Sequence, residues 1–134
     1  MRIEEVRDGH GDVLATLITT LEELPPGHSF PTNRDDELQL GLFNHPEGHK
    51  IQRHFHPPFE RNLKFTNEVL VILSGLVQVD IYDDFQVLIS THRLGANSVV
   101  ILRQGGHGFS IIKHSIIIEV KQGPYAGAED KVLF

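Results

Sequence analysis

Short runs of β-branched and aliphatic residues, separated by turn residues, are the feature of this 134-residue sequence that most limits its possible folds. The run Val69–Leu73 stops at Ser74-Gly75, and Val77–Tyr82 stops at Asp83-Asp84. Further runs occupy Val87–Ile89, Val99–Leu102 and Ile116–Val120. Short strands at roughly ten-residue spacing, with turn signals between them, are typical of an all-β sandwich or barrel. We therefore predict an all-β fold built from antiparallel strands.

The N-terminal segment admits two interpretations. Asp8–Asp12 resembles a hairpin turn between strands at Ile3–Arg7 and Val13–Thr20. The rival interpretation is a helix ended by Pro25-Pro26-Gly27, with one apolar face formed by Leu14, Leu17, Ile18, Leu21 and Leu24. We favour the strand, because the threonines of this segment suit a sheet and the segment follows a turn.

The rest of the first half predicts a loop and two more strands. Pro25–Asp36 is expected to be a loop, and Leu38–Leu42 alternates as a strand does. A turn at Asn44–Gly48 then precedes a strand at Lys50–Phe55. The strands are then numerous enough to close a small barrel. We expect one domain over residues 1–134, with an N-terminal hairpin and loop (1–36), a barrel (37–122) and a C-terminal docking tail (123–134).

Composition excludes several function classes. The formal charge is −6, from 12 Lys plus Arg and 18 Asp plus Glu, so no basic stripe is available to bind nucleic acid. The absence of cysteine excludes thiol catalysis, zinc ribbons and iron–sulfur clusters. No apolar run approaches the roughly 18 residues of a membrane span, and the first residues do not resemble a signal peptide. The expectation is a cytoplasmic protein without a membrane or nucleic-acid partner.

The nine histidines need an explanation, and His54-Phe55-His56 is the sharpest local signal among them. Residues two apart on a strand point to the same face, so the two imidazoles can converge on one point. Pro57-Pro58 ends that strand and places the pair near a barrel mouth. By contrast, His49 has the opposite parity. Five histidines are predicted to lie at the surface in turns: His10, His28, His45, His92 and His114.

Two further residues extend this pair to a predicted metal site. Glu68 stands where the next strand opens, and His107 follows the paired glycines Gly105-Gly106, which let the backbone bend toward a cavity. Three imidazoles and one carboxylate suit one divalent ion of Fe, Mn, Ni, Co or Zn, with positions left open for substrate. His54, His56, Glu68 and His107 are therefore the predicted metal ligands.

These residues resemble the two signatures of the cupin superfamily, whose members bind one metal in a small antiparallel jelly-roll barrel. Gly48, His54, His56, a Glu and Gly75 resemble the first signature, and Gly95 through His107 resembles the second. The sequence is most similar to the WbuC-like cupin-fold metalloproteins, over about Leu38 to Phe134. The segments that carry this similarity are His54–Pro57, Val79–Asp84 and Glu119–Tyr125. The resemblance implies a double-stranded β-helix and a connection with surface-polysaccharide biosynthesis.

The sequence departs from the cupin pattern at the carboxylate. Glu60 has the short spacing from His56 that the family uses, but only Glu68 is followed by a strand and a glycine. We favour Glu68 as the ligand, because its position at a strand start fixes its direction. Glu60 and Tyr82 are then candidates to carry a proton in catalysis. Residues predicted to bind substrate are Gln52, Arg61, Lys64 and Gln104, the two cations as a lid over an anionic substrate.

The leading functional hypothesis is a metal-dependent enzyme that acts on a small polar carbohydrate or sugar-nucleotide. A metal acting as a Lewis acid would support isomerase or epimerase chemistry, whereas Fe(II) with the same ligands would support a dioxygenase. The alternatives are a barrel that binds a small ligand without catalysis and a structural partner with vestigial ligands. A two-fold homodimer is the expected assembly.

Overall fold

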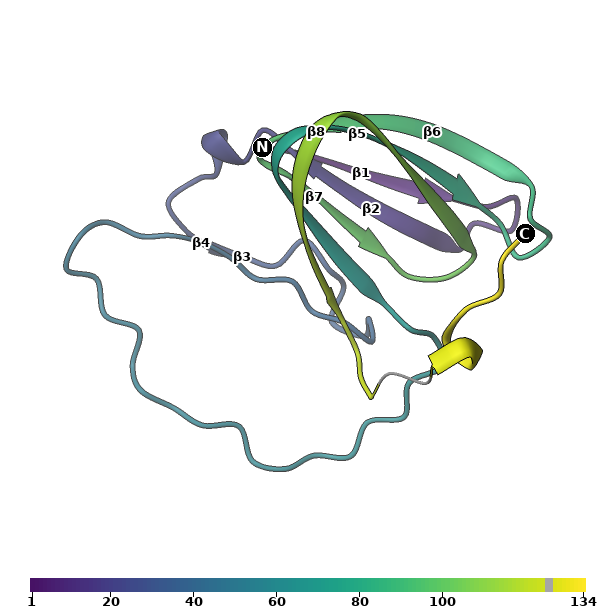
Figure 1. The fold of residues 1–134 in the computed structure, drawn as a ribbon. Helices are drawn as coiled ribbons and strands as arrows, with labels where there is room; N and C mark the ends of the chain where they lie inside the picture. Colours follow the sequence, from purple (N-terminus) through teal and green to yellow (C-terminus); the bar gives the residue numbers. More distant parts are fainter. Residues whose placement is uncertain (125–126) are drawn as a thin grey trace.

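The computed structural model describes residues 1–124 and 127–134, and its secondary structure is almost entirely strand (Figure 1). The strands are β1 (Arg2–Arg7), β2 (Val13–Thr19), β3 (Gly27–Ser29), β4 (Leu42–Asn44), β5 (Glu68–Tyr82), β6 (Leu88–Gly95), β7 (Ser98–Leu102) and β8 (Gly106–Lys121). Two short 3-10 helices are η1 (Leu21–Glu23) and η2 (Gly127–Asp130). Every strand pairing is antiparallel, which confirms the predicted all-β antiparallel class.

Two long strands organise the main sheet. Its order is β1-β2-β7-β5-β6, and β8 pairs with β5. The first half of β5 lies between β7 and β8, whereas the second half lies between β6 and β8. β3 and β4 form a separate two-stranded ribbon.

β5 and β8 bend together near Gly75, so that the two halves of the sheet face each other (Figure 1). Gly75 has φ +93°, and a Cβ there would overlap Ser115 and the carbonyl of His114, so this position needs glycine. The Ser115 hydroxyl accepts a hydrogen bond from Leu76 N at 3.1 Å. The sequence placed a strand end at Ser74-Gly75, but the structure continues the strand through a bulged bend.

The core fills the space between the two halves. Apolar side chains from the first half meet those of the second, including Ile72, Leu102, Val77 and Ile81, each at most 4% exposed. A second cluster lies on the other face of the first half, where Val69 and Ile101 are covered by leucines of the 38–42 segment. Both faces of the β7–β5 region are therefore buried, which explains why these strands read as continuous apolar runs.

The sheet remains open among the described residues. β1 and β6, the two ends of the strand order, are not paired with each other, so no closed barrel forms. Among the strands of the described residues, β8 pairs with β5 alone, and no strand pairs with the other edge of its first half. Large apolar side chains along β8 stay exposed: Phe109, Ile111, Ile112, Ile116, Ile118 and Val120.

Several predicted elements differ from the structure. The hairpin of β1 and β2 is confirmed and the rival helix over residues 14–24 is wrong. The predicted loop at Pro25–Asp36 contains β3, and the strand expected at Leu38–Leu42 begins only at Leu42. No strand forms at Lys50–Phe55, because no strand of the described chain pairs with the backbone of these residues. No helix in the described part of the chain is long and apolar enough to cross a membrane.

Candidate functional site

The open end of the folded sheet, which we call the mouth, holds a contact between a carboxylate and an imidazole from the two layers. Glu68 begins β5, and His107 is the second residue of β8. Because the bend brings these strand ends together, His107 Nε2 lies 3.2 Å from Glu68 Oε2. The two side chains are 31% and 16% exposed, respectively. The sequence predicted both residues as metal ligands, and the structure places them in direct contact.

The hydrogen bond from His107 is the main reason why the pKa of Glu68 is lowered. The hydrogen bond from His107, with the charges of His107 and Lys121, holds the pKa of Glu68 below its ordinary range, against the opposing effects of burial and of Asp130. Lys121 lies opposite Glu68 in the register of β8, and its Nζ is 2.6 Å from Asp130 Oδ2. An ionised carboxylate beside an imidazole is a donor pair that divalent metals bind.

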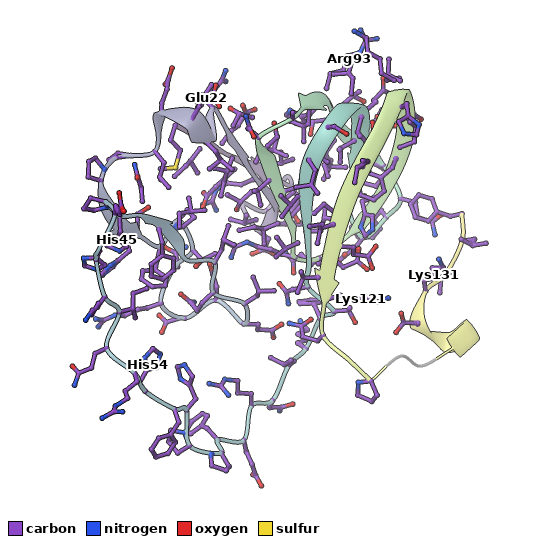
Figure 2. All side chains as sticks on the ribbon, turned by 60° about the vertical axis from the view of Figure 1, so that its left-hand side comes forward. Glu22, His45, His54, Arg93, Lys121 and Lys131 are labelled. Atoms are coloured by element: carbon purple, nitrogen blue, oxygen red, sulfur yellow. The ribbon has the colours of Figure 1, made fainter. Side chains whose placement is uncertain are left out.

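The other two predicted ligands lie on the long exposed segment between β4 and β5. The rings of His54 and His56 are 5.2 Å apart and nearly perpendicular, and His54 Nδ1 lies 2.8 Å from the carbonyl oxygen of Gln52. Figure 2 shows His54 out on this segment, well away from Lys121. Among the side chains that the structure describes, no three from His, Asp or Glu come close enough to hold one metal ion. The structure therefore brings together Glu68 and His107, and separately His54 and His56.

The two residues predicted to carry a proton lie in different surroundings. Glu60 is exposed on the long segment. Tyr82 ends β5 at the mouth, where its half-buried ring packs edge-on against Phe134 with centroids 5.2 Å apart. Phe134 also lies against Gly106, so the end of the chain covers part of the mouth.

A polar cavity of about 370 Å³ lies beside the mouth and contains Gln104. Asn67 and Arg103, the neighbours of Glu68 and Gln104 in the chain, also line it, as do Asp36 and Glu37. Arg103 pairs with Asp36 at 2.5 Å and donates to the Thr16 hydroxyl at 3.4 Å. Convergent donors and acceptors of this kind can orient a small polar ligand.

The remaining residues predicted to bind substrate lie outside this cavity. The Arg61 guanidinium lies 5.3 Å from the centre of the Phe59 ring, and Lys64 Nζ lies 4.8 Å from that of Phe65. The backbone carbonyl of Gln52 contacts His54. These three side chains belong to the long segment and not to the mouth in this structure.

Glu37 is a site residue that the sequence interpretation missed. Its carboxylate accepts hydrogen bonds from Lys64 N at 2.8 Å, Phe65 N at 3.3 Å and Asn67 Nδ2 at 3.1 Å. The bond from Lys64 N is the main cause of its lowered pKa. Glu37 thus fastens the C-terminal end of the long segment next to Glu68. Nothing in the local sequence around Glu37 signals a partner so distant in the chain.

Comparisons of the chain with protein-family models, with curated proteins and with solved structures found no match. Relationships to known families therefore rest on the motifs in the sequence.

Proposed function

We propose that this chain is a metal-binding protein of the cupin type, in which His54 and His56 join Glu68 and His107 at the mouth to hold one divalent ion. The proposed activity is metal-dependent chemistry, of an isomerase or epimerase kind, on a small polar substrate such as a carbohydrate derivative. The observation that carries this proposal is the contact of Glu68 with His107. The two residues lie at the starts of different strands, and the sequence pattern alone predicts both as ligands.

The donor atoms at the mouth fit half of such a centre. Ligand atoms lie about 2.0–2.2 Å from a divalent ion, so donors 3.2 Å apart can share one. His54 also has the surroundings of a ligand, because a backbone carbonyl next to Nδ1 leaves Nε2 free for a metal. The two pairs become one centre only if the long segment moves to the mouth.

The free edge of β8 supplies a place for that segment. We propose that residues 50–56 pair antiparallel with the first half of β8, next to His107, and so extend the sheet beyond β8. In that direction His56 reaches the mouth, and residues 57–67 have only to cross it to begin β5 at Glu68. Exposed apolar residues on both sides support the pairing: Ile51 and Phe55 on the segment, Phe109 and Ile111 on β8.

The chemistry of the mouth follows from its own residues. A divalent ion bound there would supply Lewis acidity to substrate oxygens. Glu68 is unsuited to donate a proton because its pKa is lowered. That role passes to Tyr82 or Glu60. Gln104, Asn67 and Arg103 line the adjacent cavity and would orient the substrate.

The polar cavity also favours a second candidate function. Gln104 and Arg103 line it, and the long segment contributes only its last residues, Phe65 and Asn67. A ligand could therefore bind there whether or not a metal centre forms. In that case the chain would be a binding module without catalytic activity.

Metal content and affinity test the proposal. Untagged protein would be stripped with EDTA, loaded separately with Fe(II), Mn(II), Ni(II), Co(II) and Zn(II), and measured by elemental analysis and calorimetry. We expect about one ion per chain in the parent, and a loss of at least tenfold in affinity for His54→Ala, Glu68→Ala and His107→Ala. His114→Ala is the matched control, because His114 is an exposed histidine of β8 outside the predicted ligand set. Metal binding should also slow hydrogen exchange in the first half of β8.

Three outcomes would decide against parts of the proposal. Less than about a tenth of an ion per chain after loading would remove the metal centre altogether. Parental affinity in His54→Ala would leave the long segment outside the site. If Glu60→Ala lost the metal and Glu68→Ala kept it, Glu60 would be the carboxylate ligand.

A further inference from the structure

Five aromatic rings gather at the start of the long segment, on the β3–β4 ribbon, and we call them the histidine clasp: His28, Phe30, Phe43, His45 and His49. The imidazoles of His45 and His49 are stacked, with centroids 3.8 Å apart and planes 7° from parallel. His28 lies 5.7 Å from His45 and 5.6 Å from its cross-strand neighbour Phe43. Phe30 closes the group at 6.3 Å from both His28 and Phe43. The sequence predicts surface turns for His28 and His45; His28 is exposed but lies on β3, and His45, labelled in Figure 2, is half-buried just after β4.

The surroundings of His45 within the clasp favour its neutral form. His45 is half-buried, and its Nε2 atom is buried without a hydrogen-bond partner in the described chain. Desolvation, followed by the proximity of His49 and His28, lowers the pKa of His45. Among the described residues no carboxylate forms an ion pair with any of the three imidazoles, although Glu47 lies in the same turn and Lys50 follows it. A proton gained here would therefore have no counter-charge.

The clasp and Glu37 fasten the two ends of the same segment. The turn at residues 46–49 is held by the ring stack and by the bond from His49 N to Pro46 O at 3.2 Å. Glu37 holds residues 64–67 at the other end. Residues 50–63, which include His54 and His56, have no regular secondary structure between these two fastenings.

We propose that the histidine clasp is an acid-labile fastening that sets where the segment bearing His54 and His56 begins, and that releases this segment under mildly acidic conditions. A second proton on the 3.8 Å stack would place two like charges face to face, which opposes stacking. Because the pKa of His45 is lowered in the folded chain, the clasp stabilises the fold at neutral pH and loses this effect as pH falls below about 6.5. Control of the metal centre by this release rests on the proposed function, whereas the release itself does not.

Hydrogen exchange of the metal-free protein at pH 5.5 and 7.5, corrected for intrinsic rates, tests the clasp. In the parent we expect the amides of β3, β4 and His49 to exchange about fivefold faster at the lower pH, as mutual repulsion of two charges about 4 Å apart in water implies. His49→Phe keeps a ring that can stack but cannot be charged, so the pH dependence of its exchange should be clearly smaller than in the parent, because only the effects of burial and of His28 on His45 remain. His28→Phe removes the charge of another imidazole and serves as the second variant in case His49→Phe disturbs the turn. His114→Phe, at an exposed position on β8, is the control and should behave as the parent does.

Equal protection of the ribbon at both pH values in the parent would overturn the proposal. So would a pH response as large as the parental one in both His49→Phe and His28→Phe. Failure of the metal centre is measured separately, since His107→Ala, which should not bind metal, is expected to keep the parental response of the clasp.

Discussion

The contact between Glu68 and His107 joins the two layers of the sheet, so its removal should weaken the fold even without metal. A hydrogen bond to a charged group contributes about 1.5–3 kcal/mol, whereas an exposed ion pair contributes about 0–1 kcal/mol. With side chains 16% and 31% exposed, this pair lies between these cases, and we expect a coupling of about 1 kcal/mol. For a chain of this length that corresponds to about 3 °C in melting temperature.

A double-mutant cycle measures this coupling. Urea unfolding in EDTA at pH 7 would compare the parent, Glu68→Ala, His107→Ala and the double variant. The single variants should cost more in sum than the double variant, by about 1 kcal/mol. Glu68→Ala combined with His114→Ala is the control and should be additive. Additive behaviour of Glu68 with His107 would refute the interaction, and with it the observation on which the proposed metal centre rests.

Three other changes have expected outcomes. Glu37→Gln should cost about 1 kcal/mol in urea unfolding at pH 7, because it weakens the charge-assisted bonds to Lys64 N and Phe65 N. The pKa of Glu37 is lowered in the folded chain, so its carboxylate stabilises the fold above the ordinary carboxyl pKa of about 4.3. This stabilisation is lost as pH falls through the lower folded value. Glu37→Gln should therefore lack this part of the acid sensitivity. Gly75→Ala should reduce stability by more than about 3 kcal/mol, seen as a lower melting temperature, because φ is +93° and the new Cβ would overlap Ser115. Ile101→Ala, at a side chain 1% exposed, should cost about 3 kcal/mol by the same measurement, and a loss below 1 kcal/mol would contradict its place in the core.

The strands that the sequence predicted well are those buried on both faces or joined by a tight turn. Val99–Leu102 reads as a continuous apolar run because β7 lies in the middle of the sheet with both faces covered. The hairpin of β1 and β2 has its turn residues in Asp8–Asp12, where the Asp8 carboxylate accepts from His10 N and Asp12 N. In both cases the information that decides the structure is local.

The features that the sequence interpretation missed depend on contacts between distant residues. A glycine after an apolar run signals a strand end, and only the position of Ser115 across the pair makes Gly75 a bend inside a strand. The histidine clasp has the same origin, because His28 meets His45 only when β3 pairs with β4. Alternation at Lys50–Phe55 predicts a face but cannot supply the neighbouring strand that its backbone requires.

The outer edge of the first half of β8 has no pairing strand among the described residues, and two segments could pair with it. A second copy of the chain would satisfy the predicted homodimer, whereas residues 50–56 would satisfy the predicted strand. The segment is tethered to the sheet at both ends, by β4 and by Glu68 at the start of β5. A short flexible tether gives roughly millimolar effective concentration, well above the micromolar concentration at which a separate chain competes. The chain's own segment is therefore the favoured occupant of the β8 edge. A homodimer would then have to form through another edge, such as that of β1 or β6, each of which pairs with a single strand among the described residues.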